Sequence, residues 1–102
     1  MSKATTRSAA TDQEIAKLFD ALGDSTRLKV MCLLLEKKEL CVSEVTEEIG
    51  ISMSGTSQQL KLLESYGLIT RSRSGQRVCY FPNESNPHAK LLFDCIYTLR
   101  KG

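Results

Sequence analysis

A very short gap between two predicted helices constrains this fold more than any other feature of the sequence. Ser43 is a candidate N-cap for the first of them, and Gly50 can end it in the left-handed backbone conformation that glycine tolerates. Only Ile51 separates that glycine from Ser52, which can cap a second helix that runs to a stop at Gly67. Two helices joined by a tight turn that contains glycine are typical of a helix-turn-helix.

Three further helices are predicted from capping residues and from apolar side chains that recur with a helical period. Residues 11–14 match a capping box ahead of a helix that ends at Gly23, and Asp24 or Ser25 begins the next one. That second helix is apolar on nearly all sides, which predicts a central, buried position. The Asn-Pro pair at 86–87 begins a last helix with a wide apolar stripe, made of Leu91, Leu92, Cys95, Ile96 and Leu99.

A β-hairpin is predicted between the helix-turn-helix and the last helix. Residues 68–73 and 76–81 are strand-like, Ser74 and Gly75 lie between them, and Pro82 ends the second strand. The order helix, helix, helix, helix, strand, strand, helix predicts a mainly α (α+β) winged helix-turn-helix. We expect residues 12–102 to form this one domain and residues 1–11, which are small and polar, to form a disordered N-terminal arm.

The net charge of +2 is too small to indicate a nucleic-acid partner by itself, so the distribution of charge along the chain matters. Residues 36–48 contain five glutamates against two lysines, a balance of −3. Residues 52–81 contain Lys61 and three arginines against Glu64 alone, a balance of +3. The basic side of the chain therefore lies in its second half, which contains the second helix of the helix-turn-helix and the hairpin.

The fourth helix has the composition of a DNA recognition helix, with polar side chains on one face and Leu60 and Leu63 as apolar anchors on the other. Gln58 and Gln59 are candidate readers of adenine, and the serines and Lys61 are candidate phosphate contacts. The candidate DNA-binding residues on this helix are Ser52, Ser54, Thr56, Ser57, Gln58, Gln59 and Lys61. Those on the hairpin, which can reach the backbone or the minor groove, are Arg71, Arg73, Gln76 and Arg77. Alternatively, helix and hairpin are solvated surface, but their coincidence with a helix-turn-helix favours DNA.

Five motifs give the chain a family resemblance that runs from about Ile15 to Leu99. They are LFDALGDSTRL at 18–28, ELCVSEV at 39–45, a serine at 52 followed by SQQL at 57–60, LLESYGLI at 62–69 and GQRVCYF at 75–81. With these motifs the chain resembles the ArsR/SmtB family of winged-helix repressors. The resemblance implies a homodimer joined mainly through the first and last helices, bound to a near-palindromic operator and released when an effector binds.

The four cysteines, at positions 32, 41, 79 and 95, are expected to be reduced thiols because the chain has no export signal. No C-x-x-C pair is present, so a structural zinc site is not predicted. Cys41 precedes a helix start, where the positive end of the helix favours a thiolate, and it is the most reactive candidate on physical grounds. Cys79, within a predicted strand, is interpreted as structural.

The resemblance offers three kinds of effector site for comparison. Arsenic- and cadmium-sensing relatives carry C-V-C where this chain has Cys41 and then Ser43, and one thiolate is a poor site for a soft metal. Zinc-sensing relatives place histidines on the last helix, where this chain has only His88. Persulfide- and oxidant-responsive relatives pair a cysteine at the position of Cys32 with one late in the last helix. Cys95 lies about six residues, or ~9 Å, before that second position.

Cys32, Cys95 and Cys41 are therefore the candidate effector thiols, and packing as small apolar side chains is the alternative for Cys32 and Cys95. Whether Cys32 and Cys95 can pair stays open at this point.

An enzyme is not predicted. The sequence has a single histidine, no paired buried carboxylates and no glycine-rich phosphate loop, and neither a cofactor nor a metal centre is expected. The longest apolar run, residues 30–35, is too short to cross a membrane, and the N-terminus lacks a secretion signal. We expect a soluble, cytoplasmic protein with no membrane partner.

These observations predict a sequence-specific, DNA-binding transcriptional repressor whose partners are double-stranded DNA and a second copy of the chain. Its effector would be thiol-directed, namely a reactive sulfur species, an oxidant or a thiophilic metal. The alternative is a winged-helix protein-interaction module in which the acidic segment 36–48 or the hairpin contacts another protein and the cysteines are structural. Such a module would have no affinity for DNA.

Overall fold

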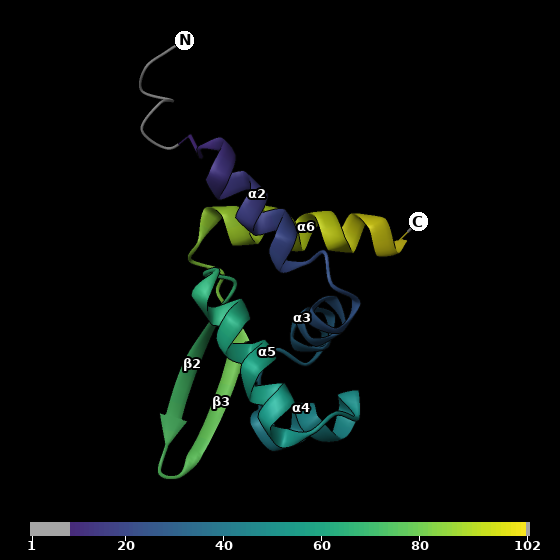
Figure 1. Ribbon diagram of the computed structural model, residues 1–102, viewed down its shortest axis with the longest axis vertical. Coiled ribbons are helices and arrows are strands. Elements are labelled where there is room, and N and C mark those ends of the chain that lie inside the picture. Colours follow the sequence, from purple (N-terminus) through teal and green to yellow (C-terminus); the bar gives the residue numbers. More distant parts are fainter. Residues whose placement is uncertain (1–8, 102) are drawn as a thin grey trace.

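The computed structural model describes residues 9–101, which form five helices and a small antiparallel sheet (Figure 1). In chain order the elements are α2 (Asp12–Ala21), α3 (Ser25–Lys37), β1 (Leu40–Cys41), α4 (Val42–Ile49), α5 (Met53–Ser65), β2 (Ile69–Ser74), β3 (Arg77–Pro82) and α6 (Pro87–Lys101). The sheet has the strand order β1-β3-β2. The predicted winged helix-turn-helix is confirmed. The predicted N-terminal arm lies outside the described residues, apart from residues 9–11.

The starts of α2 and α3 follow the predicted capping residues. Thr11 and Glu14 satisfy each other's backbone N–H groups at 2.9 and 3.1 Å, which completes the capping box of α2. At α3 the N-cap is Asp24, whose carboxylate accepts from the backbone N–H groups of Thr26 and Arg27, each at 3.1 Å. Ser25 is the first helical residue.

The predicted start of α4 is wrong by two residues because the chain forms a strand that was not expected. Cys41, and not Ser43, is the N-cap, and Gly50 ends the helix at φ +80° as predicted. Just before the helix, Leu40 and Cys41 pair with β3 as strand β1. The Glu44 carboxylate accepts from the Cys41 N–H at 2.8 Å, so this strand passes directly into the helix.

The hairpin is present, with its turn displaced by one residue from the prediction. Ser74 pairs with Arg77, so Gly75 and Gln76 form the turn and Gln76 is not part of the strand. Gly75 has φ +62°, a conformation that few other residues adopt without cost. Gln76 therefore lies at the tip of the wing.

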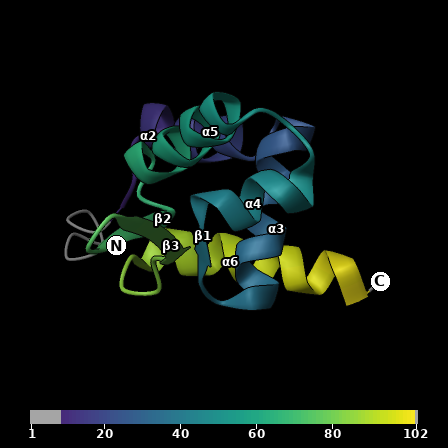
Figure 2. The ribbon, with the colours of Figure 1, turned by 90° about the horizontal axis from the view of Figure 1, so that it is seen from below.

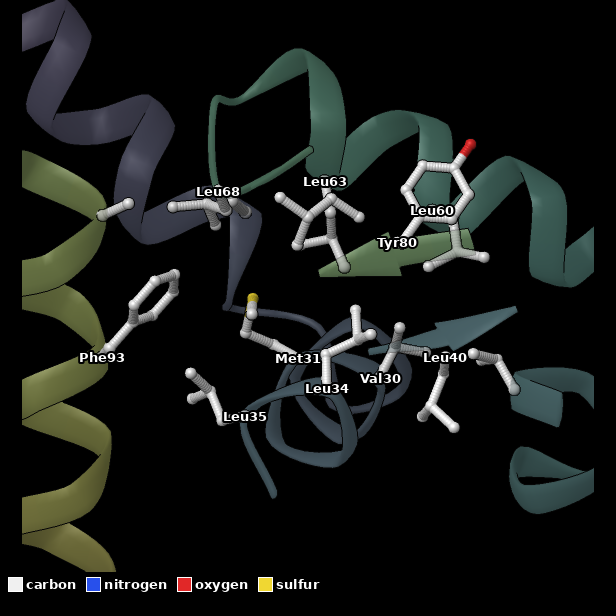
Figure 3. Close-up of a cluster of buried hydrophobic side chains, with 14 residues drawn as sticks. Val30, Met31, Leu34, Leu35, Leu40, Leu60, Leu63, Leu68, Tyr80 and Phe93 are labelled. Atoms are coloured by element: carbon white, nitrogen blue, oxygen red, sulfur yellow. The ribbon is translucent and has the colours of Figure 1, made fainter. Parts of the chain in front are cut away.

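Helix α3 lies at the centre of the core, as its composition predicts (Figure 3). Its most deeply buried residues are Val30, Met31, Leu34 and Leu35, while Leu28 and Cys32 are only half-buried. The rest of the chain contributes Ala21, Leu40, Val45, Leu60, Leu63, Leu68, Ile69, Tyr80, Ala89 and Phe93. This single core fixes α4, α5, the sheet and α6 around α3.

The helix-turn-helix and the wing occupy the same end of the molecule. Figure 1 shows α4, the start of α5 and the tip of the hairpin together at the bottom, with α2 and α6 toward the opposite end. Viewed from that end (Figure 2), α5 lies next to the hairpin, in agreement with the contacts between α5 and β2. No helix within residues 9–101 combines the length and the apolar character that crossing a membrane requires.

Candidate nucleic-acid interface

Helix α5 presents one polar face to solvent because its other face is anchored in the core. Leu60 and Leu63 are fully buried, whereas the side chains on the opposite side of the helix are exposed. Those exposed residues are Ser54, Gln58, Lys61, Leu62 and Ser65, of which Leu62 is the one apolar side chain. Ser52 caps the helix by accepting from the Gly55 N–H at 3.0 Å, so its hydroxyl already has an intramolecular partner.

Two predicted contact residues of α5 lie elsewhere than on this face. Thr56 is 0% exposed, and its hydroxyl donates to the Ser52 carbonyl oxygen at 2.9 Å, so it supports the helix and cannot reach a ligand. Gln59 is half-buried, and its Oε1 is enclosed with no hydrogen-bond partner in the part of the chain that the structure describes. Of the two predicted base-reading glutamines, Gln58 is the exposed one.

The three arginines of the wing lie on two different faces of the hairpin. Arg71 and Arg73 are two residues apart on β2 and therefore lie on one face, together with their pairing partners Tyr80 and Val78 of β3. Arg77 lies on the other face, with Cys79. Arg71 is turned toward α5, where its Nε lies 3.7 Å from the Glu64 carboxylate. Burial raises the pKa of the hydroxyl of Tyr80, which pairs across the hairpin with Arg71.

The wing and the recognition helix meet at a shallow hollow. Its lining comes from three parts of the chain: Met53 and Ser57 of α5, residues 41–43 at the start of α4, and residues 76–78 of the hairpin. Arg73, exposed on β2, and Lys61, exposed on α5, make no salt bridge within residues 9–101. The start of α5 and the tip of the hairpin lie at one end of the molecule (Figure 1).

The prediction that all four cysteines are reduced is wrong for one pair. Cys41 and Cys79 stand directly opposite each other in β1 and β3, on the same face of the sheet, and form a disulfide. Arg77 donates from Nη2 to the Cys41 sulfur at 2.9 Å. Cys32 and Cys95 are free thiols. The pairing could not be predicted from the sequence because it depends on strand β1, which was not predicted. The one local signal is that each cysteine is next to apolar residues, Cys41 after Leu40 and Cys79 between Val78 and Tyr80.

The structure does not bring Cys95 to Cys32. The Cys32 sulfur instead accepts from Arg100 Nη2 at 3.3 Å, and the hollow beside it is lined on the α6 side by Ile96, Tyr97 and Arg100. Cys95 is exposed on another face of α6. Within residues 9–101 no cluster of three or more histidine, cysteine or acidic side chains is arranged to hold a metal ion.

Large apolar side chains are exposed on α2 and α6. On α2, Phe19 is 66% exposed, and on α6, Leu91 and Leu99 are 67% and 76% exposed. Leu91, Cys95 and Leu99 follow one another at intervals of four residues, so they form a continuous stripe along the helix. This stripe lies apart from the face of α6 that packs into the core through Ala89 and Phe93.

Comparison with protein families identifies residues 24–71 as matching the model of the bacterial regulatory protein, arsR family. A transcriptional repressor SmtB homolog from Synechocystis is 38% identical over 68 residues, which are 67% of this chain and 51% of that protein. A biofilm growth-associated repressor from Xylella fastidiosa is 33% identical over 86 residues, which are 84% of this chain and 73% of the relative. The chain thus spans about half the length of the first of these relatives.

Solved structures share the fold over nearly the whole chain. HlyU from Vibrio cholerae superposes with a TM-score of 0.76 at 25% identity and covers 100% of both chains. A homodimeric winged helix-turn-helix DNA-binding domain from Mycobacterium bovis superposes with a TM-score of 0.74 at 23% identity, covering 91% of this chain and 89% of that one. The similarity to the Mycobacterium bovis domain, at 23% identity, supports the fold only.

Proposed function

Since the chain belongs to the ArsR family of bacterial regulatory proteins, we propose that it is a sequence-specific, DNA-binding transcriptional repressor. The observation that carries this proposal is the joint surface at one end of the molecule, where the polar face of α5 adjoins a wing with an exposed arginine, Arg73. The two elements can divide the work of binding DNA, because a helix in the major groove reads base edges while contacts from the wing to the backbone fix the orientation. As a bacterial DNA-binding protein, it would act in the cytoplasm.

In this proposal α5 enters the major groove with Gln58 toward the bases, since a glutamine side chain can pair with both N6 and N7 of adenine. Ser54, Ser57 and Lys61 flank it and contact phosphates. From the wing, Arg73 and Gln76 reach the neighbouring backbone. Four predicted contact residues already have a partner or are partly enclosed, so we place them at the edge of the interface: Ser52, Gln59, Arg71 and Arg77. Thr56 is buried and makes no contact with DNA in this proposal.

We also propose that the protein acts as a homodimer through the exposed apolar faces of α2 and α6. Two recognition helices related by a twofold axis fit half-sites about one helical turn, or ~34 Å, apart, so the operator is expected to be near-palindromic. The apolar stripe of α6 supports this arrangement, because an apolar surface of that kind is stabilised by burial.

The experiment that tests DNA binding is fluorescence anisotropy with an operator duplex selected from random sequence, at several salt concentrations. Lys61→Ala and Arg73→Ala should each weaken binding to all duplexes and reduce the slope of log K against log salt by about 0.9 for each phosphate that is no longer neutralised. Lys90→Ala is the matched control, because Lys90 is exposed on α6, away from the interface. Equal effects of the three substitutions, or no binding at low salt by the reduced dimer, would overturn the proposal.

We propose in addition that a thiol-directed effector releases the repressor from DNA, through the free thiols Cys32 and Cys95 or through Cys41. The reduced protein on its operator should be challenged in turn with polysulfide, peroxide, zinc, cadmium and arsenite, with the intact mass measured for each sample. Release with a covalent change identifies a reactive sulfur species or an oxidant, and release by cadmium or arsenite without one identifies a metal. If none of these agents changes binding, the cysteines are structural.

A further inference from the structure

The disulfide between Cys41 and Cys79 lies where the helix-turn-helix joins the wing. Cys41 is the residue that caps α4, the first helix of the helix-turn-helix, and Cys79 is in the middle of β3, the second strand of the wing. The bond therefore adds a covalent link between two elements that are 38 residues apart in sequence. Cys41 also lines the hollow that Ser57 of α5 shares with Gln76 and Arg77 of the wing.

The surroundings of the pair suit reversible chemistry. The Arg77 guanidinium donates to the Cys41 sulfur at 2.9 Å, and the N-terminal end of α4 begins at the same residue, so both would stabilise a thiolate at Cys41. Cys41 is 7% exposed, whereas Cys79 is half-buried and therefore the more accessible sulfur. A second hollow, lined by both cysteines together with Glu39, Glu44, Ser74 and Arg77, gives small molecules access to the pair.

We propose that Cys41 and Cys79 form a site of reversible oxidation by hydroperoxides, and that closing the disulfide lowers the affinity of the protein for DNA. This inference rests on the proposed function and assigns its effector chemistry to a pair of residues other than Cys32 and Cys95. The ligand class is a small hydroperoxide for closing the bond and a low-molecular-weight thiol for opening it.

The oxidation proceeds in two balanced steps. The Cys41 thiol first gives its proton to solvent, and the thiolate attacks the outer oxygen of the hydroperoxide. The O–O bond breaks, Cys41 becomes a sulfenic acid, and the leaving alkoxide takes up a proton from solvent to become an alcohol. The Cys79 thiol then attacks that sulfur, the S–O bond breaks, and water leaves with the thiol proton. Two thiols are oxidised by two electrons in total, and the peroxide bond is reduced by the same two electrons.

The reduction uses the difference in accessibility between the two sulfurs. An external thiolate attacks the half-buried Cys79 sulfur, and Cys41 leaves as a thiolate next to Arg77, which makes it a good leaving group. A second thiol resolves the mixed disulfide and releases the free Cys79 thiol. The net products are the dithiol protein and the oxidised small-molecule disulfide.

Closing the bond affects DNA binding because it ties the wing to α4. The wing must adjust to the path of the DNA backbone while α5 lies in the groove, and side chains or loops at interfaces commonly shift on binding. With the bond closed, β3 is held to the N-cap of α4 and this adjustment is prevented. With the bond open, they are joined only non-covalently, by the two-residue ladder of β1 and by contacts between α4 and β3.

The test uses the full chain with Cys32→Ser and Cys95→Ser, so that the paired cysteines are the only thiols. Cumene hydroperoxide should remove two hydrogen atoms from the intact mass and yield a peptide linked between Cys41 and Cys79, and dithiothreitol should reverse both changes. Anisotropy on the selected operator should show affinity falling by about tenfold on oxidation, within the usual range of allosteric coupling, and recovering on reduction. Unchanged or increased affinity in the oxidised protein would overturn the inference.

A matched variant separates the pair from general oxidation. Cys79→Ser in the same background should stop at a sulfenic acid on Cys41, trapped with dimedone, and should not lose affinity by disulfide closure. Circular dichroism checks that each variant is folded. If neither redox state binds DNA, the proposed function fails together with the effect on affinity, whereas the mass measurement still decides whether the pair cycles. If the reduced protein binds DNA but oxidation does not form the disulfide between Cys41 and Cys79, only the inference is overturned.

Discussion

At the scale of single residues, the two neighbouring glutamines of α5 have different surroundings, although the sequence predicts the same role for both. Gln58 is exposed on the polar face, and Gln59 is half-buried with an enclosed Oε1. Gln58→Ala should therefore change sequence preference, reducing discrimination at one base pair of each half-site by about 1–3 kcal/mol. Gln59→Ala should leave the preference unchanged. Selection of preferred duplexes from random DNA by both variants measures this, and a shift with Gln59→Ala alone would contradict it.

Gly67 is a second residue whose surroundings permit a sharp prediction. Its φ is +80°, and a Cβ there would stand 2.9 Å from Asn86 Nδ2, the group that donates to the Gly67 carbonyl oxygen. Gly67→Ala should lower the free energy of unfolding by about 2 kcal/mol or more, from backbone conformation and displacement of Asn86 together.

Gly75→Ala is the matched control for the backbone part of that cost. Gly75 has φ +62°, but no atom of residues 9–101 lies within 4 Å of its added Cβ, so a decrease of about 1 kcal/mol is expected. Urea denaturation measures both variants. Equal decreases would show that the Asn86 contact adds nothing at Gly67.

At the scale of elements, the start of α3 depends on Asp24, whose carboxylate accepts two backbone N–H groups. Asp24→Ala should lower the free energy of unfolding by about 1 kcal/mol, the usual cost of losing an N-cap. Ser25→Ala, one residue further on, should have little effect because Ser25 is already inside the helix and exposed. Chemical denaturation compares the two, and a larger decrease for Ser25→Ala would place the cap at the wrong residue.

The elements also show where sequence reasoning succeeds and where it stops. Helix starts with local signals, such as Thr11 with Glu14 and Ser52, are predictable because the capping partners lie within one turn. Strand β1 is not, because two residues carry no periodicity and become a strand only by pairing with β3, nearly 40 residues away. The missed strand also accounts for the displaced start of α4 and for the unexpected disulfide.

The candidate site follows the same division. The polar face of α5 and the basic wing could be predicted, since composition and order are local properties of the sequence. The burial of Thr56 could not, because its position on the helix is decided by how α5 rotates against the core. Arg100 next to Cys32 depends on how α6 packs across α3, a contact between residues 68 apart.

At the scale of the whole molecule, the exposed apolar faces of α2 and α6 lie toward the end opposite the wing, so association of two copies there leaves both DNA-binding surfaces free (Figure 1). Leu91→Glu combined with Leu99→Glu should dissociate the dimer. Burying one leucine contributes about 1.5–3 kcal/mol, so removing four from the two protomers together should weaken dimerisation by at least about ten-thousandfold. Light scattering coupled to size exclusion measures the mass.

The same substitutions connect dimerisation to recognition, because a monomer would occupy only one half of the proposed near-palindromic operator. The double variant should bind a single half-site almost as well as the parent protein does, but should lose its preference for the full site. Met53→Glu is the control for oligomeric state, since Met53 is 53% exposed on α5 and lies at the other end of the molecule. A double variant that stays dimeric, or a Met53→Glu protein that becomes monomeric, would show that the dimer interface is not on α6.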